Sequence, residues 1–248
     1  MGGALLENWK RGDEAFAIVD PFLDSAPEGV ALHEKREEVA DRQFDVIVAA
    51  IKPQMIDKVM PDYSDMFTSK GYLLSIAAGC SIARLKKVSG GKPVIRIMPN
   101  LPAAIGAGVS ALCASEDATE AQLAHARAMM ERTGTVITVE DEDAIDRFTA
   151  VAGSGPGYVF ELARAYTEAA MALGFDEDQA RAMVLGTLQG TVAMAAGSGE
   201  KLETLRNSVT SKGGTTAAGL NALNGKGELS ALLSATLEAA YDRAVELR

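Results

Sequence analysis

Residues 45–51 read Asp-Val-Ile-Val-Ala-Ala-Ile, and Lys52 and Pro53 follow directly. The run is short, rich in valine and isoleucine, and ended by a proline, which is the pattern of a β-strand. Because it is apolar almost throughout, both faces of the strand should be covered, as they are in parallel sheets. Ligands of α/β proteins bind at the carboxyl ends of such strands, so Lys52 faces either a ligand or, in the alternative interpretation, solvent on an ordinary loop.

Similar apolar runs recur through the first part of the chain, separated by segments with helical spacing. The runs lie at residues 16–19, 72–76, 94–98, 109–113 and 135–139, and residues 120–133 have one apolar helical face. Strands and helices in alternation predict a parallel sheet with helices on both faces.

The strand pattern stops near residue 145, and long alanine-rich helical segments replace it. These segments lie at residues 157–173, 176–196 and 228–247. Asp176 and Gln179 form a capping-box pattern at the start of the second segment. We therefore predict an α/β domain over residues 1–147 and an all-helical domain over residues 148–248.

Composition and charge narrow the class of protein. The chain has 248 residues, 48% of them hydrophobic and 23% charged, and a formal net charge of −10 that disfavours nucleic acid and anionic membranes as partners. Cys80 and Cys113 are the only cysteines, which is typical of a reduced compartment and too few for a four-cysteine zinc site. No apolar run has the length of a signal-peptide core or a membrane helix, so we expect a cytoplasmic protein without a metal.

Two glycine-containing segments are candidate anion sites. Residues 205–216 read LRNSVTSKGGTT, in which Gly213 and Gly214 allow consecutive backbone N–H groups to face a carboxylate. Thr215 and Thr216 can cap the helix that follows, although a plain interhelical loop would have the same composition. The N-terminal Met-Gly-Gly-Ala is either a helix start that receives a pyrophosphate or an ordinary helix N-terminus.

Asp20 follows the first apolar run and precedes Pro21. In dinucleotide-binding folds an acid at the end of the second strand contacts the adenosine ribose and opposes a 2′-phosphate. Asp-Pro is equally common as the start of a turn, so both interpretations stay open.

Five segments, taken together and in this order, resemble the pyrroline-5-carboxylate reductase family. They are AAIKP at 49–53, SIAAG at 75–79, RIMPNLP at 96–102, DEDAIDRFTAVAGSGPGY at 141–158 and LRNSVTSKGGTTAAGL at 205–220. The resemblance spans nearly the whole chain and implies a Rossmann-like dinucleotide-binding domain followed by a helical dimerisation domain. It also implies NADPH or NADH as cofactor, 1-pyrroline-5-carboxylate as substrate and L-proline as product. The partner it implies is a second copy of the chain, in a homodimer or a larger homo-oligomer.

The resemblance assigns site residues position by position. The cofactor contacts it implies are Gly2, Gly3, Asp20, Ala50, Ile51, Lys52, Ala77, Ala78 and Asn100. The substrate contacts it implies are Glu142, Val209, Ser211, Gly214 and Thr215. Thr216 matches the family residue whose hydroxyl approaches the imine nitrogen. Because a threonine hydroxyl is too weak an acid to be the sole proton source, we expect Thr216 to orient that nitrogen or to relay a proton from water. Asp20 predicts a preference for NADH.

The family pattern also includes a strand and two fingerprint glycines ahead of the position of Met1. We therefore expect the natural chain to be about ten residues longer. Two alternatives to the reductase stay open. One is a catalytically impaired relative that serves as an oligomeric scaffold, and the other is a reductase of a different cyclic imine.

Overall fold

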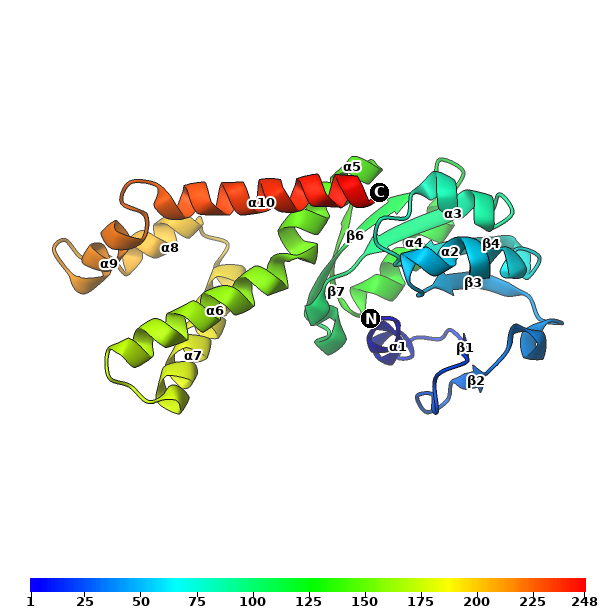
Figure 1. Ribbon diagram of the computed structural model, residues 1–248, viewed down its shortest axis with the longest axis horizontal. Coiled ribbons are helices and arrows are strands. Elements are labelled where there is room, and N and C mark those ends of the chain that lie inside the picture. The colour runs from blue at the N-terminus through cyan, green and yellow to red at the C-terminus, as the bar shows by residue number, and fades with distance from the viewer. The chain divides into compact units, whose positions relative to one another are not determined.

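The computed structural model describes residues 1–248, which divide into two compact units. The first unit comprises Met1–Pro156 together with Ala240–Arg248, and the second comprises Gly157–Ala239. The first is α/β and the second is entirely helical (Figure 1). The predicted succession of an α/β part and an all-helical part is confirmed.

The first unit contains two sheets. β1 (Ala17–Val19) and β2 (Ala31–His33) form a parallel pair. The other sheet has the strand order β3-β4-β5-β6-β7, with bounds Phe44–Ala49, Phe67–Ser75, Val94–Met98, Gly108–Ala114 and Gly134–Thr138. Every predicted strand is present. β2 was not predicted because its sequence, Ala-Leu-His, is too short to carry a pattern.

The prediction of an all-parallel sheet is wrong at one position. β5 and β6 pair antiparallel, with Ile97 opposite Leu112, whereas β3, β4 and β5 are mutually parallel and so are β6 and β7. A parallel connection needs a crossover of about a dozen residues or more. Only the segment around the short 3-10 helix η4 (Leu101–Ile105) joins β5 to β6, so the chain turns back on itself.

Helices cover both faces of the five-stranded sheet. Side chains of α1 and α4 pack with Tyr72 and Leu74 on one face, and side chains of α2 and α3 pack with Leu73 on the other. Adjacent residues of a strand point to opposite faces, so β4 contributes to both cores. The helices of this unit are α1 Gly2–Trp9, α2 Ile56–Val59, α3 Ile82–Val88, α4 Glu120–Glu131 and α5 Glu142–Phe148, with 3-10 helices at Arg36–Val39, Pro53–Met55 and Met60–Tyr63.

The second unit consists of helices joined by short loops. Its elements are α6 Gly155–Ala172, α7 Glu177–Ser198, α8 Leu202–Ser208, α9 Thr215–Asn224 and α10 Glu228–Leu247, of which α6 begins and α10 ends in the first unit. Asp176 and Gln179 form the predicted capping box at the start of α7. None of the helices combines the length and the apolar composition that crossing a membrane requires.

The division between the units differs from the predicted boundary after residue 147. α5 and the π-helix η5 (Thr149–Gly153) stay with the first unit because Ile145 and Phe148 pack against Ala111 and Cys113 of β6. The end of α10 also belongs to the first unit, since the Tyr241 hydroxyl donates to Asp143 Oδ1 over 2.6 Å. A helical signal alone does not reveal which helices pack on the sheet.

Candidate active site

The carboxyl ends of β3, β4 and β5 lie at one edge of the sheet because the strands are parallel neighbours. The predicted cofactor residues that follow them are Ala50, Ile51 and Lys52 after β3, Ala77 and Ala78 after β4, and Asn100 after β5. The structure therefore brings these residues to the same edge, which is where α/β proteins bind ligands.

The start of α1 lies against the same edge. A Cβ atom added to Gly2 would lie 2.8 Å from the Cβ of Ala50, closer than packed carbon atoms approach. Gly3 has no such neighbour within 4 Å. Leu5 and Trp9, on the buried side of α1, anchor the helix in the core. The first-turn N–H groups of α1, which lack intrahelical acceptors, are thus held beside the end of β3.

Asn100 is buried and its side-chain amide forms two hydrogen bonds within the protein. Its Oδ1 accepts from the Val109 N–H over 2.9 Å, and its Nδ2 donates to the Ala152 carbonyl over 3.1 Å. These bonds tie the end of β5 to β6 and to η5. A cofactor contact at Asn100 would therefore use its backbone, or the remaining N–H or lone pair of a side chain whose position is fixed.

The loop after β4, residues 76–81, has its own supports. The Ala77 N–H donates to the buried Ser75 Oγ over 3.3 Å. Gly79 has a φ of +69°, in the left-handed region, and a Cβ there would lie 2.5 Å from the Leu247 carbonyl oxygen. Only glycine fits this position without strain. Of the two predicted contacts in the loop, Ala77 is buried and Ala78 is exposed.

Glu142, the first residue of α5, is bonded within the protein. Its Oε1 accepts from Arg96 Nη1 and from the Ile82 N–H, each over 2.8 Å. Arg96 lies on β5 with a side chain only 3% exposed, whereas the side chain of Glu142 is 25% exposed. Both bonds go to Oε1, so the predicted substrate contact at Glu142 would fall to Oε2, which accepts no hydrogen bond within the protein.

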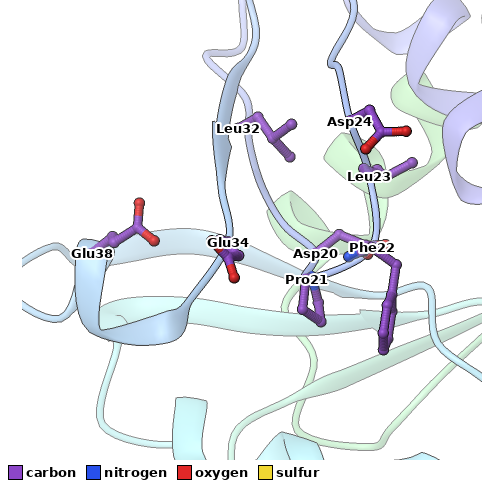
Figure 2. Close-up of a pocket in the computed structure, with 8 residues that line it drawn as sticks. All are labelled: Asp20, Pro21, Phe22, Leu23, Asp24, Leu32, Glu34 and Glu38. Atoms are coloured by element: carbon purple, nitrogen blue, oxygen red, sulfur yellow. The ribbon is translucent and has the colours of Figure 1, made fainter.

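Asp20 lines an open cavity of about 450 Å³ between the loop after β1 and the segment from β2 to η1 (Arg36–Val39). Its Oδ1 accepts from the Phe22 N–H over 2.9 Å, so the carboxylate also begins a turn. Figure 2 shows the lining residues, which are Asp20, Pro21, Phe22, Leu23, Asp24, Leu32, Glu34 and Glu38. With several carboxylates and no basic side chain in its lining, the cavity repels anions.

The other predicted residues, Val209, Ser211, Gly214, Thr215 and Thr216, belong to the second unit, where α8 leads into α9. Gly214 is the N-cap of α9, and Thr215 and Thr216 are its first helical residues, so the prediction that they cap the helix is wrong. The left-handed Gly213 turns the chain so that the helix begins directly after Gly214.

The Gly214 N–H is not free for a ligand, because it donates to the Ser211 carbonyl over 3.1 Å. The Ala218 N–H makes the first intrahelical bond of α9, to the Gly214 carbonyl. The N–H groups of Thr215, Thr216 and Ala217 therefore have no intrahelical acceptor and can face an anion. The two threonine side chains are exposed.

Neither cysteine has the environment of a reactive thiol. Cys80 and Cys113 are buried and unpaired. Burial raises the pKa of both thiols, and the nearby Glu142 carboxylate raises that of Cys113 further. Because the thiolate is the nucleophilic form, neither residue is suited to covalent catalysis near neutral pH.

Sequence reasoning missed Arg96 and the contact between Leu247 and Gly79. A signal for Arg96 existed, because it is the only charged residue in the strand Val-Ile-Arg-Ile-Met and a buried arginine needs a partner. The Leu247 contact joins residues far apart in the chain, and no local pattern indicates it.

A sheet whose parallel strand ends meet a glycine-rich helix start, followed by a helical unit, defines a Rossmann-like nucleotide-binding protein with an added helical part. Comparison with known proteins narrows this class to one family. Residues 142–247 match the family model described as "Pyrroline-5-carboxylate reductase dimerisation". The chain belongs to the pyrroline-5-carboxylate reductase family.

Individual relatives agree with this assignment. The pyrroline-5-carboxylate reductase of Vibrio alginolyticus is 40% identical over 84% of this chain and 77% of that protein, and that of Pseudomonas aeruginosa is 37% identical over 85% and 77%. The structure of the Coxiella burnetii reductase aligns with a TM-score of 0.90 at 31% identity, covering 99% of this chain and 94% of that one. The Plasmodium falciparum pyrroline carboxylate reductase with NADP bound aligns with a TM-score of 0.85 at 25% identity, covering 100% and 94%.

Proposed function

We propose that this chain catalyses the NAD(P)H-dependent reduction of 1-pyrroline-5-carboxylate to L-proline, the last step of proline biosynthesis. The observation that carries the proposal is the 40% identity to the Vibrio alginolyticus reductase over 84% of the chain. In this reaction a hydride adds to the imine carbon, the C=N bond becomes a single bond, and the nitrogen gains a proton.

The residues at the strand ends fit a dinucleotide. Gly2 leaves no room for a side chain against Ala50, so backbone N–H groups of α1 can approach a pyrophosphate. Ala50, Ile51, Lys52, Ala77, Ala78 and Asn100 would contact the rest of the cofactor, and Lys52 forms no ion pair that would compete. The bound cofactor supplies the hydride, and the protein holds it in place.

The start of α9 suits the substrate. The free first-turn N–H groups and the positive end of the helix dipole favour a carboxylate beside Thr215 and Thr216. Val209, Ser211 and Gly214 would complete the contact surface. Holding the carboxylate fixes the position of the ring, and the Thr216 hydroxyl then orients the imine nitrogen or relays a proton to it.

NADH should be the better cofactor. An adenosine 2′-phosphate that entered the cavity beside Asp20 would meet the carboxylates of Asp24, Glu34 and Glu38 as well. Ribose hydroxyls can donate hydrogen bonds to the same oxygens.

The functional form should be a homodimer or a larger homo-oligomer in the cytoplasm. The second unit leaves many large apolar side chains exposed, including Val159, Phe160, Leu162, Val192, Met194 and Leu232. Apolar surface of this extent favours burial against a second copy. The two unpaired cysteines suit a reducing compartment.

A substrate-profile assay tests the function. NADH and NADPH oxidation would be followed with 1-pyrroline-5-carboxylate and with a six-membered cyclic imine carboxylate, and L-proline would be quantified. We expect proline formation and a higher kcat/KM for the five-membered ring. A higher kcat/KM for the larger ring would indicate a reductase of another imine. A folded oligomer that oxidises neither cofactor would indicate the scaffold.

A further inference from the structure

We infer that Glu142 is a positioning residue for the cofactor loop, residues 76–81, through the two bonds that its Oε1 accepts. This role rests on the proposed function, because the loop carries the cofactor contacts Ala77 and Ala78. It differs from the role that the family resemblance implies for Glu142.

Glu142 supplies a missing acceptor at the point where the loop ends. Ile82 is the first residue of α3, and the N–H groups of a first helical turn have no intrahelical acceptor. Ser81 satisfies one such group by accepting from the Arg84 N–H over 3.2 Å. Glu142 Oε1 satisfies the Ile82 N–H over 2.8 Å. The loop is therefore fixed at its start through Ser75 and at its end through Glu142.

Arg96 holds the Glu142 carboxylate in this position. The guanidinium is almost completely buried, and Nη1 donates to the same Oε1 that accepts from Ile82. Moving Oε1 toward a substrate would leave a buried cation without its partner, which is costly, so a substrate contact would fall to Oε2. The negative charge of Glu142 would also repel a substrate carboxylate placed beside it.

The helix that carries Glu142 is itself firmly held. Asp141 caps α5 by accepting from the Ala144 N–H over 2.7 Å, and Ile145 is completely buried. The Tyr241 hydroxyl donates to Oδ1 of Asp143, the residue that follows Glu142. A carboxylate on such a support can fix the position of the loop end that it bonds.

Three variants and a control separate positioning from substrate binding. Glu142→Ala removes the acceptor, and Glu142→Gln keeps an oxygen that can accept from Ile82. The double variant Arg96→Met with Glu142→Leu removes the acceptor without leaving a buried charge unpaired. The control is Glu140→Gln, which changes an exposed acid two residues away that forms no ion pair.

The first readout is amide hydrogen exchange in the protein without cofactor. We expect faster exchange across residues 76–85 in Glu142→Ala and in the double variant, and parental exchange in the control. Glu142→Gln keeps the acceptor but loses the charge that pairs with Arg96, so its exchange should lie closer to that of the parent than to that of Glu142→Ala. The second readout is NADH binding in the absence of substrate, followed by nicotinamide fluorescence. We expect the Kd to rise about tenfold when the acceptor is lost and to change less than about threefold when it is kept.

Steady-state kinetics complete the test. KM for the cofactor should follow the Kd, and KM for 1-pyrroline-5-carboxylate should stay at the parental value. A rise in substrate KM with unchanged cofactor Kd and unchanged loop exchange would overturn the inference while leaving the reductase function intact. A parent protein that neither binds NADH nor reduces the substrate would contradict the proposed function, and the positioning role with it.

Discussion

The Asp20 carboxylate contributes both to the turn that follows β1 and to the negative charge of the cavity. Oδ1 accepts from the Phe22 N–H, which the turn requires, and the negative charge adds to that of Asp24, Glu34 and Glu38. The two interpretations that the sequence left open are therefore compatible. A variant that keeps the acceptor and removes the charge can separate them.

Asp20→Asn is that variant. Asparagine can accept from the Phe22 N–H, so the turn should persist, while the field that opposes a 2′-phosphate becomes weaker. We expect the ratio of kcat/KM for NADPH to that for NADH to rise about tenfold, which corresponds to about 1.4 kcal/mol. Asp41→Asn, an exposed acid outside the cavity, is the control. An unchanged ratio would show that Asp20 does not determine cofactor choice.

Thr216 carries the most specific chemical role in the account. Removing its hydroxyl in Thr216→Ala should lower kcat by about 10- to 1,000-fold, because the imine nitrogen loses its hydrogen-bond partner. Thr216→Ser, which keeps the hydroxyl, should retain most of the activity. NADH affinity should be unaffected in both variants. Equal activity of the alanine variant and the parent would remove Thr216 from the mechanism.

At the scale of elements, the contact between α1 and β3 determines whether the helix start can face a ligand. Gly2 is needed because a Cβ there would collide with Ala50, whereas Gly3 faces open space. Alanine substitutions at these two adjacent glycines should therefore have opposite effects on the stability of the protein without cofactor.

Gly2→Ala should lower the thermal midpoint, because α1 must move away from the end of β3 to relieve the contact. Gly3→Ala should keep or raise the midpoint, since alanine favours the helix over glycine by about 0.5–1 kcal/mol. Thermal unfolding followed by circular dichroism checks both. The close packing at Gly2 would be refuted by a parental midpoint in its alanine variant.

Most elements could be predicted from local sequence because their signals are local. The apolar run at 45–51 overlaps β3, and the run at 94–98 coincides with β5. The capping box at Asp176 starts α7 as predicted. The antiparallel turn between β5 and β6 could also have been predicted, since the connection is too short for a crossover.

The remaining features depend on tertiary contacts. The strand ends that gather at one edge were predictable from topology, but the use of Glu142 by Arg96 and Ile82 was not, because three separate elements meet there. The N-cap at Gly214 depends on the backbone angles of Gly213, which composition does not determine. Local residue patterns therefore predict helices and strands more readily than they predict what each side chain contacts.

At the scale of the whole molecule, we expect the exposed apolar residues of the second unit to form the interface between copies of the chain. Leu232 on α10 is 64% exposed, and we expect it to be covered in the oligomer. Leu232→Lys should therefore shift the protein to a smaller species, measured by light scattering after size-exclusion chromatography. Glu238→Lys places a lysine on the same helix at a polar position and should leave the assembly unchanged. If the Leu232→Lys variant kept the mass of the parent protein, Leu232 would be excluded from the interface.

The proposed activity of the chain is the reduction of a C=N bond. It requires hydride to pass from the nicotinamide to the imine carbon. The most direct measurement uses NADH deuterated at the transferred position with 1-pyrroline-5-carboxylate and analyses the product by mass spectrometry. We expect L-proline that carries one deuterium on Cδ, the ring carbon that was the imine carbon of the substrate. Absence of proline, or proline without the label, would contradict the proposed activity.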